Sequence, residues 1–321
     1  MTWLITGGAG YIGSHVVASA RAAGYDVAII DDLSSGFTDR IPEGVPFIHA
    51  DIADRDAVSR AIQELNITGV VHLAARKQVG ESVEKPFEYW EWNVGKMATL
   101  LEVLNAHGVM NFVFSSSAAV YGNPADGATA LNEATPCKPL SPYGATKLAG
   151  EILVESLASI DKLNAISLRY FNVAGTANPV LADRLALNLI PIALTLMTNN
   201  KPLTVFGTDY PTADGTCIRD YVHVVDLAES HVAAMKYLEA GNTGHIKLNV
   251  GTGQGASVLD IVAALKECAG SELEWVDTGR RAGDPVSVVA SVEEANKVLG
   301  WSSQRTLLDT VRSAYDAWPR S

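Results

Sequence analysis

The strongest constraint on this chain is a glycine-rich stretch near its N-terminus. A short apolar run, Trp3 to Ile5, is followed by four glycines between positions 7 and 13, and then by an apolar pattern of helical spacing. Glycine lets a backbone turn tightly and approach a pyrophosphate, and a helix N-terminus offers unpaired N–H groups to the phosphates. A glycine turn can also be purely structural, but its position between a strand and a helix favours dinucleotide binding. The residues expected at the dinucleotide are Gly7, Gly10, Tyr11, Ile12 and Gly13.

The next apolar segment ends in two acidic residues. Residues 26–30 are typical of a strand, and Asp31 and Asp32 follow it. A carboxylate about 20 positions after the glycines accepts hydrogen bonds from an adenosine ribose, and it repels a 2′-phosphate. The pattern therefore favours NAD over NADP. The loop expected to wrap the adenine is Leu33, Ser34, Ser35 and Gly36.

Two further predicted strands, residues 46–49 and 69–73, end in candidate cofactor contacts. Asp51, which precedes Ile52, either meets the adenine or caps the helix predicted over residues 55–65, and both interpretations stay open. Small residues at a strand end let the backbone pass close to a cofactor. The contacts predicted there are Asp51, Ile52, Leu73, Ala74, Ala75 and Lys77. His72 has apolar neighbours on both sides, so we expect a packed core histidine.

A long helix is predicted from Pro86 to His107, and it contains one polar residue among apolar neighbours, Asn93. A buried asparagine needs hydrogen-bond partners. We expect Asn93 to bond a nearby loop and so to affect the cofactor site indirectly.

The residues expected to carry chemistry follow a predicted strand over residues 111–114. Three serines, Ser115 to Ser117, stand at its end, and Tyr143 and Lys147 lie one turn apart on a later predicted helix. A nearby ammonium and the positive end of nicotinamide both favour the phenolate of a tyrosine. Tyr143 could then remove a proton from a substrate hydroxyl while hydride leaves the same carbon, with Ser117 holding the oxygen. Serines at a strand end are also common turn residues, and a Tyr–Lys pair alone is weak evidence, but the glycine fingerprint strengthens both.

Charge and cysteine content limit the possible partners. A formal net charge of −12 argues against nucleic acid or an anionic membrane. Cys137, Cys217 and Cys268 show neither a disulfide framework nor metal-ligand spacing. Because the cysteines lack metal-ligand spacing, we expect no metal. Because the sequence shows no basic signal segment and no apolar stretch long enough to cross a bilayer, we expect a cytoplasmic location.

Several stretches together resemble the extended short-chain dehydrogenase/reductase family, and within it the nucleotide-sugar 4-epimerases. They include Thr6-Gly-Gly-Ala-Gly-Tyr-Ile-Gly, Ser115-Ser-Ser-Ala-Ala-Val-Tyr-Gly, Arg169-Tyr-Phe-Asn and Arg281-Ala-Gly-Asp. The stretch from Phe206 to Val224 is the most specific, because in the family it serves the nucleotide sugar. The resemblance covers nearly the whole chain.

The resemblance implies the fold and the substrate contacts. We expect an α/β protein with a Rossmann-like, doubly wound, mostly parallel sheet in residues 1–172 and a smaller substrate lobe in residues 173–321. The chain is expected to cross between the lobes. Phe171 would back the nicotinamide, and residues 203–207 would lie against the uracil. The implied substrate contacts are Lys77, Ser117, Tyr143, Asn172, Asn188, Leu189, Thr204, Val205, Phe206, Arg219, Arg281 and Asp284.

The implied reaction is the interconversion of UDP-galactose and UDP-glucose by oxidation at C4, rotation of the 4-keto sugar and reduction on its other face. Ala118 and Ala119 cannot move protons, which argues against a sugar dehydratase. Val288 stands where some relatives carry a bulky aromatic, so UDP-N-acetylglucosamine is an alternative substrate. The alternative that is not an enzyme is a catalytically silent regulator that binds NAD. Family members are commonly homodimers, which here would pair the helices beginning near Pro86 and Tyr143.

Overall fold

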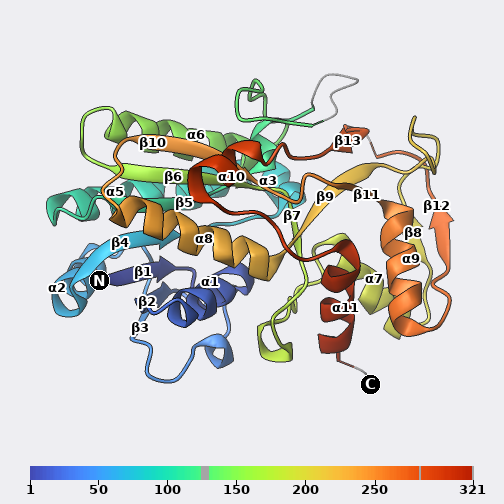
Figure 1. The fold of residues 1–321 in the computed structure, drawn as a ribbon, viewed down its shortest axis with the longest axis horizontal. Coiled ribbons are helices and arrows are strands. Elements are labelled where there is room, and N and C mark those ends of the chain that lie inside the picture. The colour runs from blue at the N-terminus through green and yellow to red at the C-terminus, as the bar shows by residue number, and fades with distance from the viewer. Residues whose placement is uncertain (124–129, 282, 320–321) are drawn as a thin grey trace.

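A seven-stranded parallel sheet forms the centre of the structure, a computed structural model that describes residues 1–123, 130–281 and 283–319 (Figure 1). Its spatial order is β10-β6-β5-β4-β1-β2-β3, and every neighbouring pair is parallel. The strands are β1 (Thr2–Thr6), β2 (Asp26–Asp31), β3 (Phe47–His49), β4 (Ile67–His72), β5 (Asn111–Ser117), β6 (Asn164–Tyr170) and β10 (His245–Val250). The order reverses between β1 and β4, which is where ligands bind in doubly wound sheets. The predicted fold class is confirmed.

Helices cover both faces of this sheet. Residues of α1 (Tyr11–Ala22) and α8 (Val224–Glu239) pack on one face. Residues of α2 (Arg55–Leu65), α5 (Lys96–Ala106) and α6 (Pro142–Ala158) pack on the other. His72 is 2% exposed and bonds the Thr6 hydroxyl at 2.9 Å, so the prediction of a core histidine is confirmed.

The long helix predicted from Pro86 to His107 is interrupted. It consists of α4 (Pro86–Trp90), a π-helical turn (Glu91–Gly95) and α5. The π turn contains Asn93, whose side chain bonds the backbone of Arg76 at 2.8 and 3.0 Å. Because a π turn adds a residue within a helix, it re-aims the side chain it carries. The apolar periodicity could not reveal this insertion.

The second lobe is built from short strands and three helices. Strands β7 (Asn172–Ala174), β11 (Gly255–Ser257) and β13 (Ser287–Val288) all pair with β9 (Ile218–His223), and β8 (Leu203–Val205) pairs with β12 (Trp275–Asp277). Its apolar core joins α7 (Leu189–Thr198), α9 (Val258–Ala269) and α11 (Leu307–Ala317). The remaining elements are α3 (Val79–Glu84), α10 (Glu293–Leu299) and the 3₁₀ turns Thr38–Arg40, Ala118–Val120 and Pro179–Leu181.

The apolar residues between Leu185 and Met197 predict a helix that starts at Leu185, but α7 begins later, at Leu189. Two bonds hold the preceding segment in another conformation. Leu185 N donates to the Asp183 carboxylate at 3.1 Å, and Leu187 N donates to Leu185 O at 2.7 Å. The run of leucines predicts a helix from Leu185, but these bonds delay its start by four residues.

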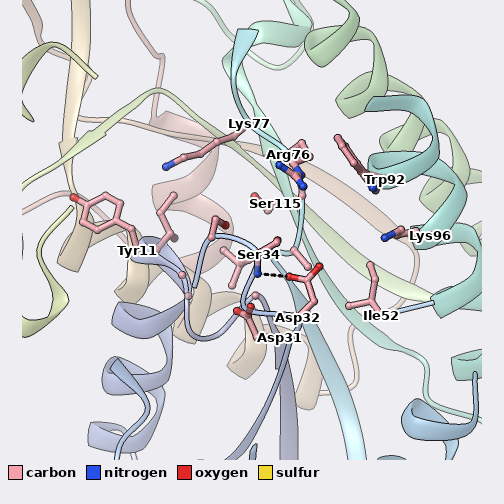
Figure 2. A pocket seen from close by; sticks show the side chains of 18 of the residues that line it. Tyr11, Asp31, Asp32, Ser34, Ile52, Arg76, Lys77, Trp92, Lys96 and Ser115 are labelled. Carbon is pink, nitrogen blue, oxygen red and sulfur yellow. Dashed lines mark hydrogen bonds between the residues drawn. The ribbon is translucent and has the colours of Figure 1, made fainter. Parts of the chain in front are cut away.

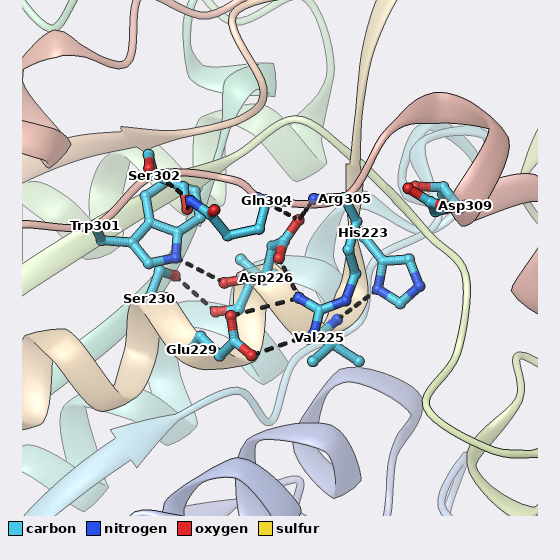
Figure 3. A network of polar contacts seen from close by, with 12 residues as sticks. His223, Val225, Asp226, Glu229, Ser230, Trp301, Ser302, Gln304, Arg305 and Asp309 are labelled. Carbon is cyan, nitrogen blue, oxygen red and sulfur yellow. Dashed lines mark hydrogen bonds and ion pairs between the residues drawn. The ribbon is translucent and has the colours of Figure 1, made fainter.

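The chain returns to the first sheet after residue 172. Strand β10 pairs with β6, and α8 packs against α1. The segment after α10 is then fixed to α8 through Asp226, which accepts from the backbone N of Gln304 and Arg305 and pairs with the Arg305 guanidinium (Figure 3). The lobes are therefore joined by several crossings rather than by one linker.

Contacts at the first crossing hold residues 175–177. The Tyr11 hydroxyl donates to Gly175 O at 2.5 Å, and Ala177 N donates to His15 Nε2 at 3.1 Å. On the other side, Thr176 N donates to the Ser313 hydroxyl, which also bonds His223 Nε2 at 3.0 Å. Side chains of α1 and α11 thus form hydrogen bonds with the same segment, residues 175–177.

Candidate active site

The glycines of the N-terminal turn have two different roles: some are needed for the turn itself, and one leaves space for a ligand. Gly7 has a φ of +70°, and a Cβ added to Gly13 would lie 2.0 Å from Gly7 O. A Cβ on Gly10 would meet nothing nearer than Gly7 O at 3.1 Å, and Gly10 lines the main cleft. The turn itself therefore requires Gly7 and Gly13, whereas Gly10 leaves space for a ligand. The first N–H groups of α1, which have no intrahelical partners, begin beside it.

The two acidic residues at the end of β2 differ in their bonds. Asp31 accepts from Ala9 N at 3.0 Å and from Leu33 N at 2.8 Å, so it holds the glycine turn and the next loop together. Asp32 accepts from Ser34 N at 2.8 Å (Figure 2). Burial raises the pKa of Asp31. Burial also acts to raise the pKa of Asp32, but its bonds with Ser34 and the charges of Lys96 and Arg76 lower it overall, which favours the ribose-accepting anion.

Most predicted cofactor residues line one continuous cleft at the carboxyl ends of the strands. They are Gly7, Gly10, Tyr11, Ile12, Gly13, Asp31, Asp32, Ser34, Ser35, Asp51, Ile52, Leu73, Ala74, Ala75, Lys77, Ser115, Tyr143 and Lys147. Leu33, Gly36, Asn93 and Phe171 are not among its lining residues. Gly36 packs so close to Ala9 that its Cβ would lie 2.9 Å from the Ala9 side chain, and Phe171 is buried in an apolar cluster.

The cleft also contains a basic and aromatic group that the sequence did not predict, formed by Arg76, Trp92 and Lys96 (Figure 2). The Arg76 guanidinium lies 4.0 Å from the centre of the Trp92 ring. Lys96 forms an ion pair with Asp51, and Asp54, not Asp51, caps α2. The capping alternative for Asp51 is therefore wrong.

Asn93 lies behind the cleft wall. Besides its two bonds to Arg76, its Nδ2 donates to the Thr146 hydroxyl at 3.1 Å. The expectation of a structural hydrogen bond to a nearby loop is confirmed. The side chain ties the loop after β4 to α6.

Tyr143, Lys147 and Ser117 meet at the other end of the cleft. The Ser117 side chain lies close enough to the Tyr143 hydroxyl to act on its pKa, and the Lys147 Nζ lies 6.0 Å from the centre of the Tyr143 ring. Lys147 is 4% exposed and donates to Ser115 O at 2.7 Å. These contacts put a phenol, an ammonium and a hydroxyl within reach of one substrate oxygen.

Burial affects both titrating groups of this trio. It lowers the pKa of Lys147 to about 7 and raises that of Tyr143, while the bond with Ser117 acts to lower the pKa of Tyr143. The pKa of a buried phenol falls when positive charge is placed beside it. That Lys147 and a nicotinamide together provide this charge stays a prediction.

A second tyrosine, Tyr170, also lines the cleft and was not predicted. Its hydroxyl bonds the Nε2 of the fully buried His231, whose Nδ1 is 2.8 Å from Leu227 O. Because Nδ1 must donate to that carbonyl, Nε2 accepts from Tyr170. Burial lowers the pKa of His231 to about 4, which keeps this acceptor neutral at pH 7.

Four predicted substrate residues lie together in the second lobe. The Arg219 and Asp284 side chains are 3.6 Å apart, and the Arg281 guanidinium stacks 3.8 Å from the centre of the Phe206 ring. Burial raises the pKa of the Cys217 thiol, on which the charges of Arg219, Asp284 and Arg281 also act. Arg219 also donates to Pro285 O at 2.9 Å. A guanidinium pair and a carboxylate can bind a diphosphate and hydroxyls.

The other predicted substrate residues differ in exposure. Asn172 and Asn188 are exposed, and Asn188 precedes α7 without a side-chain cap bond. Thr204 and Leu189 are half-buried. Val205 is 1% exposed, so it can present only its backbone to a ligand.

Neither a metal site nor a membrane segment is evident in the described ranges. Among residues 1–123, 130–281 and 283–319, no group of three His, Cys, Asp or Glu side chains could hold a metal ion. Within the same ranges, no helix has the length and apolar character needed to cross a bilayer.

Comparisons with known proteins agree with this geometry. Residues 3–251 match the model of the NAD dependent epimerase/dehydratase family. A UDP-glucose 4-epimerase of Corynebacterium glutamicum is 44% identical over 99% of this chain and 95% of its own, and one of Streptomyces lividans is 41% identical over 98% and 95%. The crystal structure of a UDP-glucose 4-epimerase from Stenotrophomonas maltophila, with bound NAD and formylated UDP-arabinopyranose, superimposes with a TM-score of 0.94 at 37% identity, covering 99% and 97% of the two chains. The chain therefore belongs to the NAD-dependent epimerase/dehydratase family.

Proposed function

We propose that this protein interconverts UDP-galactose and UDP-glucose with NAD. The observation that carries the proposal is the meeting of Tyr143, Lys147 and Ser117 at one end of the dinucleotide cleft. The likeness to named UDP-glucose 4-epimerases over nearly the whole chain supports the substrate. Arg219, Arg281 and Asp284 supply the groups that a sugar nucleotide requires.

The residues divide the chemistry between them. NAD, when bound, supplies reversible hydride acceptance. Tyr143 takes the proton of the sugar C4 hydroxyl and later returns it, while Ser117 holds the same oxygen by a hydrogen bond. Lys147, held by Ser115 O, supplies positive charge that favours the phenolate.

The second lobe holds the nucleotide while the sugar turns. Arg219 is anchored through Pro285 O, and Arg281 is supported by Phe206. A diphosphate bound by these guanidinium groups would stay in place while the 4-keto sugar rotates about its linkage. Reduction on the opposite face then completes the epimerisation.

The first test is to incubate the purified protein with UDP-galactose without added NAD and to separate the nucleotide sugars by chromatography. Appearance of UDP-glucose would establish epimerisation with a retained cofactor. If UDP-galactose persists with or without added NAD, the proposal fails and a catalytically silent NAD-binding regulator becomes the better interpretation.

A second candidate substrate is UDP-N-acetylglucosamine. Val288 pairs in register with Arg219 and packs in the apolar cluster that contains Phe171, so its side chain lies between predicted substrate and cofactor contacts. A small side chain there leaves room for an N-acetyl group. Rapid turnover of UDP-galactose without any turnover of UDP-N-acetylglucosamine would reject this candidate.

We also propose that the protein is a cytoplasmic homodimer. Phe87 and Trp90 on α4 and Ile152 on α6 are 89%, 44% and 56% exposed, and such apolar groups on neighbouring helices are typical of interfaces. Cys137, Cys217 and Cys268 are free thiols, which suits a reducing compartment. Light scattering should give twice the monomer mass for the wild type and the monomer mass for a Phe87→Glu/Ile152→Glu variant. A monomeric wild type would contradict the dimer.

A further inference from the structure

A buried ion pair lies directly behind the catalytic trio. Arg169 donates to the Glu151 carboxylate through Nε at 2.9 Å and through Nη2 at 2.7 Å. The two side chains are 3% and 1% exposed. This fork-to-fork geometry fixes both groups in orientation as well as in distance. Neither residue touches the cleft, and the reaction proposed above does not use them.

Glu151 belongs to the same helix face as the catalytic residues. Tyr143, Lys147 and Glu151 follow one another at intervals of four on α6. Each contacts a different one of three successive serines at the end of β5. Tyr143 lies beside the Ser117 side chain, Lys147 donates to Ser115 O, and Glu151 accepts from the Ser116 hydroxyl at 2.5 Å.

Arg169 connects this arrangement to the neighbouring strand. It is the register partner of Ser116 in the parallel β5–β6 pair, and it precedes Tyr170, which lines the cleft. Its Nη1 donates to the Tyr121 hydroxyl at 2.9 Å, and that hydroxyl donates to Asn249 Oδ1 at 2.6 Å. The ends of β5, β6 and β10 are thus tied to one point on α6.

We propose that Glu151 and Arg169 form a positioning pair that sets the Ser117 hydroxyl against Tyr143 and Lys147, an inference that rests on the proposed function. A buried ion pair is weak evidence for stability, because apolar replacements of similar volume are often neutral or stabilising. The pair instead fixes the position of α6 relative to the ends of β5 and β6. Catalysis is sensitive to that register, because a displacement of about 1 Å can reduce the rate on the order of 100-fold.

The test replaces both charges together, so that neither is left buried alone. We expect the Glu151→Leu/Arg169→Met double variant to unfold near the wild-type temperature and to retain its NAD content. Its kcat for UDP-galactose should fall on the order of 10–100-fold while KM stays near the wild-type value. The matched control is Glu155→Gln, one turn further along α6, which removes a surface ion pair with Lys247 and should leave kcat and KM unchanged.

A single variant covers the case in which the double variant does not fold. Ser116→Ala removes the bond between Glu151 and β5 but keeps the ion pair, and we expect kcat to fall several-fold without a change in KM. A folded double variant, or a folded Ser116→Ala variant, with wild-type kcat would overturn the inference.

The two proposals fail in distinguishable ways. A wild type that does not convert UDP-galactose rejects the proposed function and the role of the pair with it. Activity that is lost in Tyr143→Phe but kept in the double variant rejects the positioning pair alone.

Discussion

The cofactor cleft and the substrate side of this protein are built by different means. The cleft is lined by residues at the ends of parallel strands, where backbone geometry is set by sheet register and by glycine packing. The substrate side consists of charged and aromatic residues around short strands. These residues contact one another, as in the Arg219–Asp284 pair and the Arg281–Phe206 stack.

This difference suggests what each region must do. A cleft formed by strand ends needs little rearrangement to receive a dinucleotide, which suits a cofactor that stays bound through many cycles. Side chains that contact one another must exchange those contacts for ligand contacts, which suits a substrate that enters, turns and leaves. Tyr143 lies in the cleft and Ser117 lies beside it, so the proposed proton transfer would take place where the preformed region ends.

The largest expected effect is a loss of kcat in a variant that still binds both NAD and UDP. Tyr143→Phe removes the hydroxyl that is proposed to carry the proton, and kcat should fall by about 10²–10⁴-fold. NAD content and the binding of UDP should stay near wild type, measured by absorbance after denaturation and by calorimetry. A variant that keeps full activity would show that another group moves the proton.

Two glycine variants test whether the cleft is preformed. A Cβ at Gly13 would lie 2.0 Å from a backbone oxygen, so Gly13→Ala should lower the free energy of unfolding by about 1–3 kcal/mol or more. Gly10→Ala meets no such contact and should fold normally but retain less NAD. Thermal unfolding and NAD content distinguish the two variants. Equal stability losses would contradict the division of roles between the glycines.

On the substrate side, Arg219→Met should weaken binding without affecting the cofactor. Hydrogen bonds to charged groups contribute about 1.5–3 kcal/mol, so KM for UDP-galactose should rise about 10–100-fold. NAD content should not change. Arg312→Met, which removes a surface pair with Glu267 on α9, is the control. A loss of NAD in Arg219→Met would mean that the two regions are not independent.

A smaller effect on the free energy of unfolding should appear when the histidines at the contacts between the lobes are protonated. Burial lowers the pKa values of His15 and His223 to about 4, and both histidines act as acceptors at or beside the crossing. Between about pH 6.5 and pH 4 the unfolded chain binds more protons than the folded one at these sites. The contribution of these two histidines to the free energy of unfolding should therefore fall as pH decreases through this range and level off below pH 4.

Thermal unfolding at successive pH values measures this slope. His223→Asn keeps an oxygen that can accept from Val225 N but does not titrate, so its acid slope should be shallower than that of the wild type. His107→Gln, at the end of α5, serves as the control and should keep the wild-type slope. An unchanged slope in His223→Asn would show that the acid sensitivity has another origin.

The sequence by itself determined the parts of the site that are local in the chain. The strand, glycine turn and helix from Thr2 to Ala22 are continuous in the chain. The spacing of their glycines therefore predicts both the fold class and the binding of a dinucleotide. Tyr143 and Lys147 are one helical turn apart, so their pairing is also fixed locally. The acidic end of β2 and the serines at the end of β5 follow from the rule that parallel strands present their carboxyl ends at one edge.

The tertiary structure alone decided which distant residues meet. Arg76 stacks on Trp92 of the π turn, Tyr170 bonds His231, and Glu151 of α6 pairs with Arg169 of β6. None of these pairs has a fixed spacing in the chain, because each depends on how two elements pack. Apolar periodicity reports which face of an element is buried, but it does not report which polar side chain of another element will be buried against it.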